Sequence, residues 1–264
     1  MKILTSFAYA LSFLTKLPVP NTKYDEEAYK RSIFFYPIIG FFIGIAVIIP
    51  LKTLFVLYAP SPKVVLIIPF IYVAINYWIT GMLHYDGFCD CIDAFSPVGK
   101  SKEERLSILK DSNVGALGSG AGTLLIVGKV LAIFCIFWEV SAVPNIHIEL
   151  SSLFIILIFV PVLGRLAIVL TAYRGKYPRE QGTGKSIIEN TKFPVAAFCI
   201  ITTTYLMLSA EIMHPLIYLS VVILNVIYWK IKANQKLSGI TGDVLGACCE
   251  TTELTILLTT LFIF

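Results

Sequence analysis

Long apolar stretches recur along the whole chain and constrain its fold more than any other feature. They cover residues 33–51, 64–83, 114–138, 151–173, 193–210 and 213–229, and a seventh from Asp243 to Phe264. A helix needs about 20 apolar residues to cross a bilayer, and barrel strands are shorter and alternate in polarity. The chain is 57% hydrophobic and only 14% charged, against about 25% charged in a soluble domain. We therefore expect an all-α, polytopic helical membrane protein with about seven transmembrane helices, forming a single integral-membrane catalytic domain over residues 1–264.

The N-terminal apolar stretch, residues 3–17, is too short to span a membrane comfortably. Lys2 and Lys16 bound it, and Pro18 stops it. A cleaved signal peptide is one interpretation, but no small-x-small cleavage site precedes Asp25. We therefore expect an uncleaved helix that lies in the interface or inserts halfway.

Basic residues alternate strictly between the loops. The three poor loops hold only Lys52 and Lys63, whereas sixteen Lys and Arg residues lie in loops 16–31, 85–112, 174–192 and 230–242. Because basic loops stay on the cytoplasmic side, this pattern places the four rich loops in the cytoplasm and the C-terminus outside. We expect an integral protein of the inner cell membrane with a cytoplasmic active site.

Three carboxylates follow the 64–83 stretch at helical spacing. If that helix continues to residue 93, Asp86, Asp90 and Asp93 share one face at i, i+4 and i+7. Like charges so placed repel unless a cation binds, and oxygen ligands suit a hard ion such as Mg²⁺ with substrate phosphates. Gly87 would let a bulky ligand come close. A solvated acidic helix end is the alternative, and a metal site is favoured.

A zinc site from His84, Cys89 and Cys91 is a weaker alternative. The two cysteines are spaced C-x-C rather than C-x2-C, and a fourth ligand is not apparent. We expect both cysteines to be small apolar fillers.

Two polar segments are further candidates for phosphate binding. Lys110, Asp111 and Asn113 precede a glycine-rich helix start, where free backbone N–H groups can bind an anion. The segment 174–186 resembles a P-loop only superficially, since Arg179 stands where the motif needs glycine and no strand precedes it. It remains a flexible cationic loop suited to phosphate or nucleotide.

Arg165 falls inside an expected span and therefore needs a partner in the bundle interior. Inserting an arginine at mid-membrane costs about 2.5–3.5 kcal/mol on insertion scales. Glu250 and Glu253 on the last helix are the candidate partners, and a purely structural ion pair is an equal alternative. Near the start of that helix, Asp243 faces the same compartment as the aspartates at 86–93 and could complete their metal shell.

In order along the chain, these motifs resemble the cobalamin synthase family, the adenosylcobinamide-GDP ribazoletransferases. The resemblance rests on His84-x-Asp86-Gly87-x-x-Asp90-x-x-Asp93, Lys110-Asp111-Ser112 with Gly115 and Gly118, Gly164-Arg165, and Thr241-Gly242-Asp243-x-x-Gly246-Ala247. Pro37-x-x-Gly40-x-x-x-Gly44 also fits. Two departures are Cys89 and Cys91 around Asp90, where small residues are expected, and Ala94-Phe95 after Asp93, where glycine is expected.

The resemblance implies a Mg²⁺-dependent phosphotransfer at a late step of cobalamin biosynthesis. A hydroxyl of α-ribazole, or of its 5'-phosphate, attacks the cobinamide-linked phosphate of adenosylcobinamide-GDP, and GMP leaves. Such chemistry needs mainly positioning and charge neutralisation. The implied metal ligands are Asp86, Asp90 and Asp93, and the implied catalytic residues are Asp90, Asp111 and Asp243. The implied substrate-binding residues are His84, Lys110, Asn113, Arg165, Arg174 and Lys185.

The expected partners are the two substrates and the lipid bilayer, with no nucleic acid; other late cobalamin enzymes are candidates. Two other functions compete with this interpretation. A CDP-alcohol phosphotransferase would also use helix-borne aspartates and Mg²⁺, but its D-G-x2-A-R run is absent from the sequence. A divalent-cation transporter would place its charges near the bilayer midplane, whereas this acidic segment lies at the end of a span.

Overall fold

The computed structural model describes residues 2–20, 24–58, 61–141 and 146–263, and these are helical with no strand among them. The helices in chain order are α1 (Lys2–Leu14), α2 (Glu26–Arg31), η1 (Ser32–Phe35), α3 (Tyr36–Tyr58), α4 (Pro62–Thr80), α5 (Leu83–Phe95), α6 (Lys102–Ile108), α7 (Ala116–Ser141), α8 (Ile146–Ala172), α9 (Lys185–Asn190), α10 (Phe193–Ser209), α11 (Pro215–Leu237) and α12 (Gly242–Leu261). The expectation of an all-α chain is confirmed.

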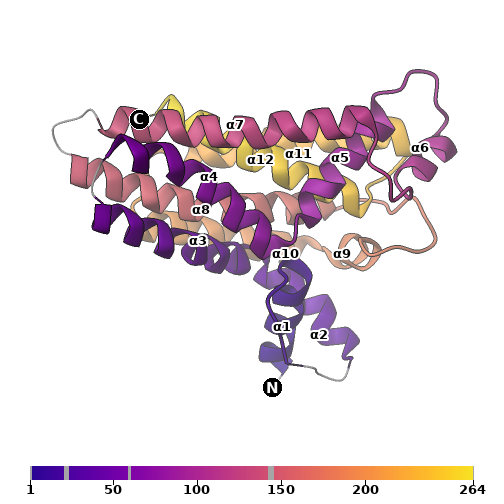
Figure 1. Cartoon of the computed structure of the whole chain (residues 1–264). Coiled ribbons are helices and arrows are strands. Elements are labelled where there is room, and N and C mark those ends of the chain that lie inside the picture. The colour runs from indigo at the N-terminus through magenta and orange to yellow at the C-terminus, as the bar shows by residue number, and fades with distance from the viewer. Residues whose placement is uncertain (1, 21–23, 59–60, 142–145, 264) are drawn as a thin grey trace.

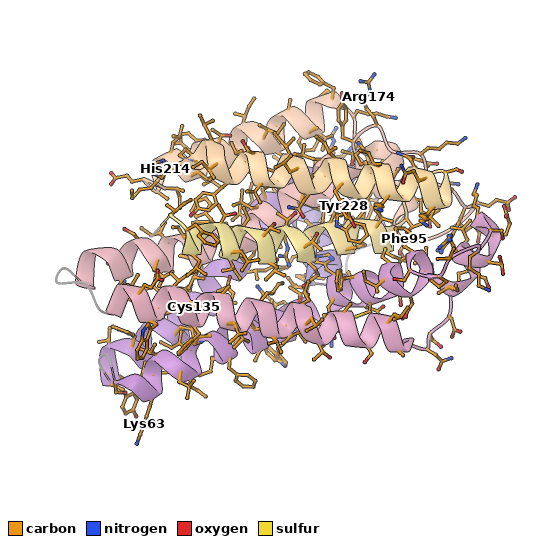
Figure 2. The ribbon with its side chains drawn as sticks, turned by 90° about the horizontal axis from the view of Figure 1, so that it is seen from above. Lys63, Phe95, Cys135, Arg174, His214 and Tyr228 are labelled. Atoms are coloured by element: carbon orange, nitrogen blue, oxygen red, sulfur yellow. The ribbon has the colours of Figure 1, made fainter. Side chains whose placement is uncertain are left out.

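Within the described residues, six helices are long and apolar enough to cross a membrane. They lie within Glu26–Tyr58, Lys63–Thr80, Ala116–Val140, Leu150–Ala172, Pro215–Leu237 and Gly242–Leu261. The seventh expected span, α10, has 17 residues and reaches only about 25 Å, less than the roughly 30 Å hydrocarbon core. It still runs from the end of the bundle that holds Arg174 to the end that holds His214 (Figure 2). The structure is therefore that of a polytopic helical membrane protein, with six candidate spans in its described part and with α10 as a shorter apolar helix.

The apolar α8 lies at the centre of this bundle because α3, α11 and α12 pack around it. Its contact with α3 depends on Gly40 and Gly44. A Cβ at Gly44 would lie 2.3 Å from the carbonyl oxygen of Ile158, and one at Gly40 would lie 2.6 Å from that of Pro161. Small residues at this spacing let two membrane helices approach closely, so the early glycine pair is explained by helix packing.

The helix formed by the 64–83 stretch does not continue through residue 93, because the helix breaks between α4 and α5. Gly81 and Met82 both have left-handed backbone conformations, with φ of 65° and 59°. Gly81 ends α4 with a hydrogen bond to the carbonyl of Tyr77, as glycine commonly does at a helix C-terminus. Beside the break, the backbone N–H of Lys16 donates a 2.8 Å hydrogen bond to the carbonyl oxygen of Ile79. Residues 83–95 consequently leave the line of α4 and contact α12.

The basic loops gather at one end of the bundle, where α5, α6 and α9 lie, and the C-terminus lies at the other end (Figure 1). A 2.8 Å hydrogen bond from Ile240 to Lys176 joins two of these loops. Lys23, which belongs to the first basic loop, is outside the described residues. The helix α1 is short and, beside α2, projects away from the bundle at a steep angle to the long helices (Figure 1). Which end faces the cytoplasm, and how deeply α1 inserts, remain predictions.

Candidate active site

The helices α5 and α12 touch at two glycines. A Cβ at Gly87 would lie 2.9 Å from both the Cα and the carbonyl oxygen of Asp243, and one at Gly246 would lie 2.9 Å from the carbonyl oxygen of His84. Such distances leave no room for a side chain, so glycine is needed on each helix. The contact brings the acidic segment of α5 against the Thr241-Gly242-Asp243 start of α12.

A cavity of about 310 Å³ opens at this crossing, and we call it the aspartate cavity. Asp86 and Asp243 both line it, together with His84, Thr183 and Gly184. The loop that carries Gly184 packs closely, since a Cβ there would lie 2.7 Å from the backbone nitrogen of Gly242. The structure thus brings the first and the last acidic motifs to one cavity.

Asp90 lies one helical turn beyond Asp86 and is half-buried. Burial, together with the negative charges of Asp86, Asp243 and Asp93, raises the pKa of its carboxyl to about 7. Four carboxylates therefore act on one another across the crossing of α5 and α12. A bound cation would relieve this repulsion and stabilise the charged form of Asp90.

Asp93 is engaged differently from the other two carboxylates of α5. One oxygen accepts a 2.7 Å hydrogen bond from the backbone N–H of Gly115, and the other accepts a 2.8 Å bond from that of Gly118. These groups open α7, where free N–H groups favour an anion. The sequence predicted an anion site at this helix start, and the anion found there is the carboxylate of Asp93.

The residues present suit a metal ion whose other ligands, the majority, are oxygens of water and substrate. Among the described residues, no three His, Cys, Asp or Glu side chains converge tightly enough to hold an ion by themselves. Mg²⁺ in phosphotransfer sites is commonly held by one or two carboxylates plus substrate phosphates. Asp86 and Asp243 on one cavity, with Asp90 adjoining, meet that requirement.

The alternative zinc site receives no support from the structure. Cys89 and Cys91 are buried, with 1% and 0% of their surfaces exposed. Cys89 packs against α7, where a Cβ at Gly122 would lie 2.7 Å from its sulfur. Burial raises the pKa of both thiols, which disfavours the thiolate that zinc needs. Packing is the role that the sequence predicted for both cysteines.

His84 is a buried side chain on the wall of the aspartate cavity. Its Nε2 atom has no hydrogen-bond partner among the described residues. Burial, together with the nearby Arg165 guanidinium, lowers the pKa of the imidazole to about 3. His84 is therefore neutral near pH 7 and can exchange a hydrogen bond with a ligand in the cavity.

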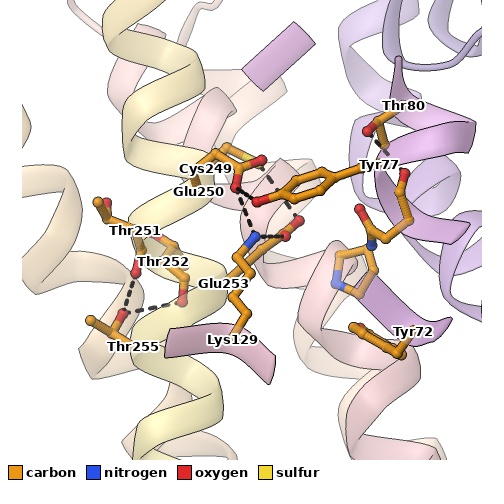
Figure 3. A network of polar contacts seen from close by, with 12 residues as sticks. Tyr72, Tyr77, Thr80, Lys129, Cys249, Glu250, Thr251, Thr252, Glu253 and Thr255 are labelled. Atoms are coloured by element: carbon orange, nitrogen blue, oxygen red, sulfur yellow. Dashed lines mark hydrogen bonds and ion pairs between the residues drawn. The ribbon is translucent and has the colours of Figure 1, made fainter. Parts of the chain in front are cut away.

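Arg165 belongs to a charged network in the bundle interior, and Figure 3 shows its members Lys129, Glu250 and Glu253. Its guanidinium pairs with Glu253, one of its two expected partners. Lys129 bridges Glu253 and Glu250 at 2.7 and 2.8 Å, and the hydroxyl of Tyr77 donates to Glu250 at 2.8 Å. Two cations thus balance two anions out of water. Arg165 is 1% exposed, which argues against the direct phosphate contact that the sequence suggested.

The segment after α6 is exposed and held by its own hydrogen bonds. The carboxylate of Asp111 accepts from the backbone and side-chain nitrogens of Asn113 at 3.0 and 2.8 Å. These bonds lower the pKa of Asp111. The negative charge of Asp111 contributes to the raised pKa of Asp90, so this loop lies near the acidic segment. Lys110 is likewise exposed, and none of the three residues lines the aspartate cavity.

Two further residues were expected to bind phosphate, Arg174 and Lys185. Arg174 lies on the far side of α9 from the aspartate cavity, and Lys185 lies at the start of α9. Arg174 lines a second cavity of about 550 Å³, at the same end of the bundle as Phe95 (Figure 2). Lys185, at the start of α9, donates a 2.8 Å hydrogen bond to the carbonyl of Glu180 and lines neither cavity. The structure therefore separates these two cations from Asp86.

Arg179 is a site residue that the sequence reasoning missed. Burial raises the pKa of the Cys91 thiol, Asp243 and Asp90 raise it further, and Arg179 offsets them. A guanidinium therefore lies beside the carboxylates, where it also donates to the carbonyl of Leu106 at 3.2 Å. Arg179 lies in the cationic loop of the sequence, but nothing in the spacing of that loop distinguishes it from the other basic residues there.

Comparison with known proteins assigns similarity over nearly the whole chain. The family described as cobalamin-5-phosphate synthase (CobS) matches residues 6–261. A protein of Alkaliphilus oremlandii named adenosylcobinamide-GDP ribazoletransferase is 32% identical and covers 94% of this chain and 93% of its own length. Proteins of the same name from Clostridioides difficile and Clostridium botulinum strain Okra are 32% and 29% identical. The first covers 96% of this chain and 95% of its own length, and the second covers 99% of each. No solved structure matches.

Proposed function

The chain belongs to the cobalamin-5-phosphate synthase family, and on this premise we propose that it transfers phosphocobinamide from adenosylcobinamide-GDP to α-ribazole or α-ribazole 5'-phosphate. The products are GMP and adenosylcobalamin or its 5'-phosphate. The aspartate cavity is the observation that assigns this reaction to particular residues, because Asp86 of α5 and Asp243 of α12 both line it. The activity for which the relatives are named indicates the substrates.

Asp86 and Asp90 are the proposed metal ligands. Asp86 lines the aspartate cavity, and burial and neighbouring carboxylates destabilise the charged form of Asp90. Bound Mg²⁺ would supply charge neutralisation on the diphosphate. Asp93 keeps a supporting role in this proposal, because both of its oxygens hold the start of α7. Its hydrogen bonds fix the orientation of the helix that carries the other two.

Asp243 is the proposed proton acceptor. It faces Asp86 across the same cavity, so an acceptor hydroxyl placed between them is within reach of its oxygens. The hydroxyl oxygen forms a bond to the cobinamide-linked phosphorus, the bond from that phosphorus to the bridging oxygen breaks, and the proton passes to Asp243. Asp111 is less suited, because hydrogen bonds from Asn113 stabilise its charged form and it lies outside the cavity.

His84 and the cations orient the reactants. The neutral imidazole of His84 is available to a substrate hydroxyl or phosphate oxygen. Arg179 and the exposed Lys110 offer positive charge beside the acidic segment. Arg165 acts indirectly in this proposal, because its ion pair with Glu253 supports the cavity wall on which His84 lies. Asn113 positions the Asp111 carboxylate rather than the substrate.

We also propose that the end holding α5, α6 and α9 faces the cytoplasm, with the C-terminus outside, in the inner cell membrane. The concentration of basic loops at this end supports that orientation. The function is tested by incubating the purified protein in liposomes with adenosylcobinamide-GDP, α-ribazole and Mg²⁺. We expect GMP and a cobamide in equal amounts, and a folded protein that forms neither product would refute the proposal.

A further inference from the structure

A second cavity lies beside the aspartate cavity, and α9 separates the two. Ile187 lines the aspartate cavity, and the next residue, Ile188, lines the second, which measures about 550 Å³. Tyr177 also lines this second cavity, and the charge of Arg179 and that of Asp243 both act on its hydroxyl. A ligand bound at the aspartates could therefore extend past α9 into the second cavity.

The side chains of the second cavity have an unusual combination of chemistry. Three cations, Arg174, Lys176 and Lys192, surround it together with the aromatic rings of Tyr173 and Tyr177. Cations bind phosphate, and aromatic rings stack on a nucleobase. Positive charge alone is what any cytoplasmic loop would carry, so the argument depends on what else lines the cavity.

Of the described residues on this cavity wall, Glu189 is the one that carries a carboxylate. Its contact with Lys185 is long, at 4.0 Å, and its side chain is 56% exposed, so its oxygens are available to a ligand. A carboxylate has two acceptor oxygens and matches a pair of adjacent N–H donors. Guanine presents such a pair on its Watson–Crick edge, from N1 and the 2-amino group, whereas adenine does not.

We propose that the second cavity binds the guanosine monophosphate half of the dinucleotide-like substrate, with Glu189 reading the guanine edge and Arg174 and Lys176 holding its phosphate. This inference rests on the proposed function, which supplies a guanosine diphosphate substrate. The phosphorus under attack then lies in the aspartate cavity, and the leaving GMP occupies the far side of α9.

The test compares binding of GMP with binding of inosine monophosphate, which lacks the 2-amino group. Calorimetry on the full-length protein in detergent measures both affinities without requiring turnover. We expect the wild type to prefer GMP about tenfold, as for loss of one hydrogen bond to a charged group. Glu189→Gln should reduce this preference to near onefold. Glu180→Gln, a matched change in the same cytoplasmic segment at a side chain that lines neither cavity, should retain it.

A phosphate variant separates this proposal from binding of a lipid headgroup. Arg174→Ala should weaken GMP and inosine monophosphate binding equally, about tenfold, and should leave the preference for guanine unchanged. If it alters only the dependence of activity on phosphatidylglycerol in liposomes, the cavity binds lipid phosphate and the proposal is wrong. Equal wild-type affinities for the two nucleotides would also overturn it. Absence of product formation despite selective GMP binding would instead refute the proposed function alone.

Discussion

Gly87 of α5 lies directly against the backbone of Asp243 at the start of α12, so that a Cβ at position 87 would come within 2.9 Å of two backbone atoms. This contact joins acidic motifs that are more than 150 residues apart in the chain. It also determines the width of the cavity in which the proposed chemistry occurs. Changes at this contact are therefore expected to affect activity before they affect the rest of the bundle.

Gly87→Ala should reduce turnover at least tenfold, because the added methyl group must push α5 away from α12. Overpacking of this kind costs about 1–3 kcal/mol of stability. Turnover and the melting temperature in detergent measure the two effects. Gly120→Ala is the matched control, since a Cβ there meets nothing within 4 Å, and it should retain full activity. Similar losses in both variants would contradict the role given to the contact.

Asp93→Asn should lower stability, because an amide can accept only one of the two backbone hydrogen bonds that open α7. The loss should be about 1–3 kcal/mol, the cost of leaving a buried donor unsatisfied.

Asp90→Asn should instead raise the melting temperature in Mg²⁺-free buffer, because it removes like-charge repulsion. Thermal unfolding of the two variants side by side checks both directions. An Asp93→Asn variant as stable as the wild type would show that the Asp93 carboxylate does not stabilise the start of α7.

Lys129→Met should be severely destabilising, because it leaves Glu250 and Glu253 buried without their shared cation. Removal of one partner from a buried ion pair costs about 3–5 kcal/mol. The variant Tyr77→Phe removes one hydrogen bond from the same network and should cost only about 1 kcal/mol. Protein yield and melting temperature in detergent distinguish these outcomes. A Lys129 variant as stable as Tyr77→Phe would contradict the charge balance inferred for the network.

Chelation of divalent cations should abolish turnover, and added Mg²⁺ should restore it. The same treatment should change stability as well, since Mg²⁺ relieves the repulsion acting on Asp90. We expect Mg²⁺ to raise the melting temperature of the wild type and to have a smaller effect on Asp86→Asn. Full activity in excess chelator would remove the basis for the metal assignment.

The sequence predicted much of this fold because membrane helices follow from local composition. Helical spacing also placed Asp86 and Asp90 on one face correctly, although the helix that carries them is separate from α4. Gly81 is a residue type that commonly ends a helix, so the sequence contains a signal for the end of α4. The left-handed conformation of Met82 could not be predicted, because methionine has no preference for it. Tertiary contacts set the other outcomes: Asp93 pairs with backbone groups 22 and 25 residues away, which spacing along one helix cannot reveal.

The crossing of α5 and α12 brings together Asp86 and Asp243, the two residues to which we assign the phosphotransfer. Single-turnover formation of GMP from adenosylcobinamide-GDP with α-ribazole and Mg²⁺ in liposomes tests this assignment most directly. Asp86→Asn and Asp243→Asn should each lower the rate at least a thousandfold while the protein still unfolds in one cooperative melting transition, as expected for loss of a group that acts in the transition state. A wild-type rate in either variant would contradict the account.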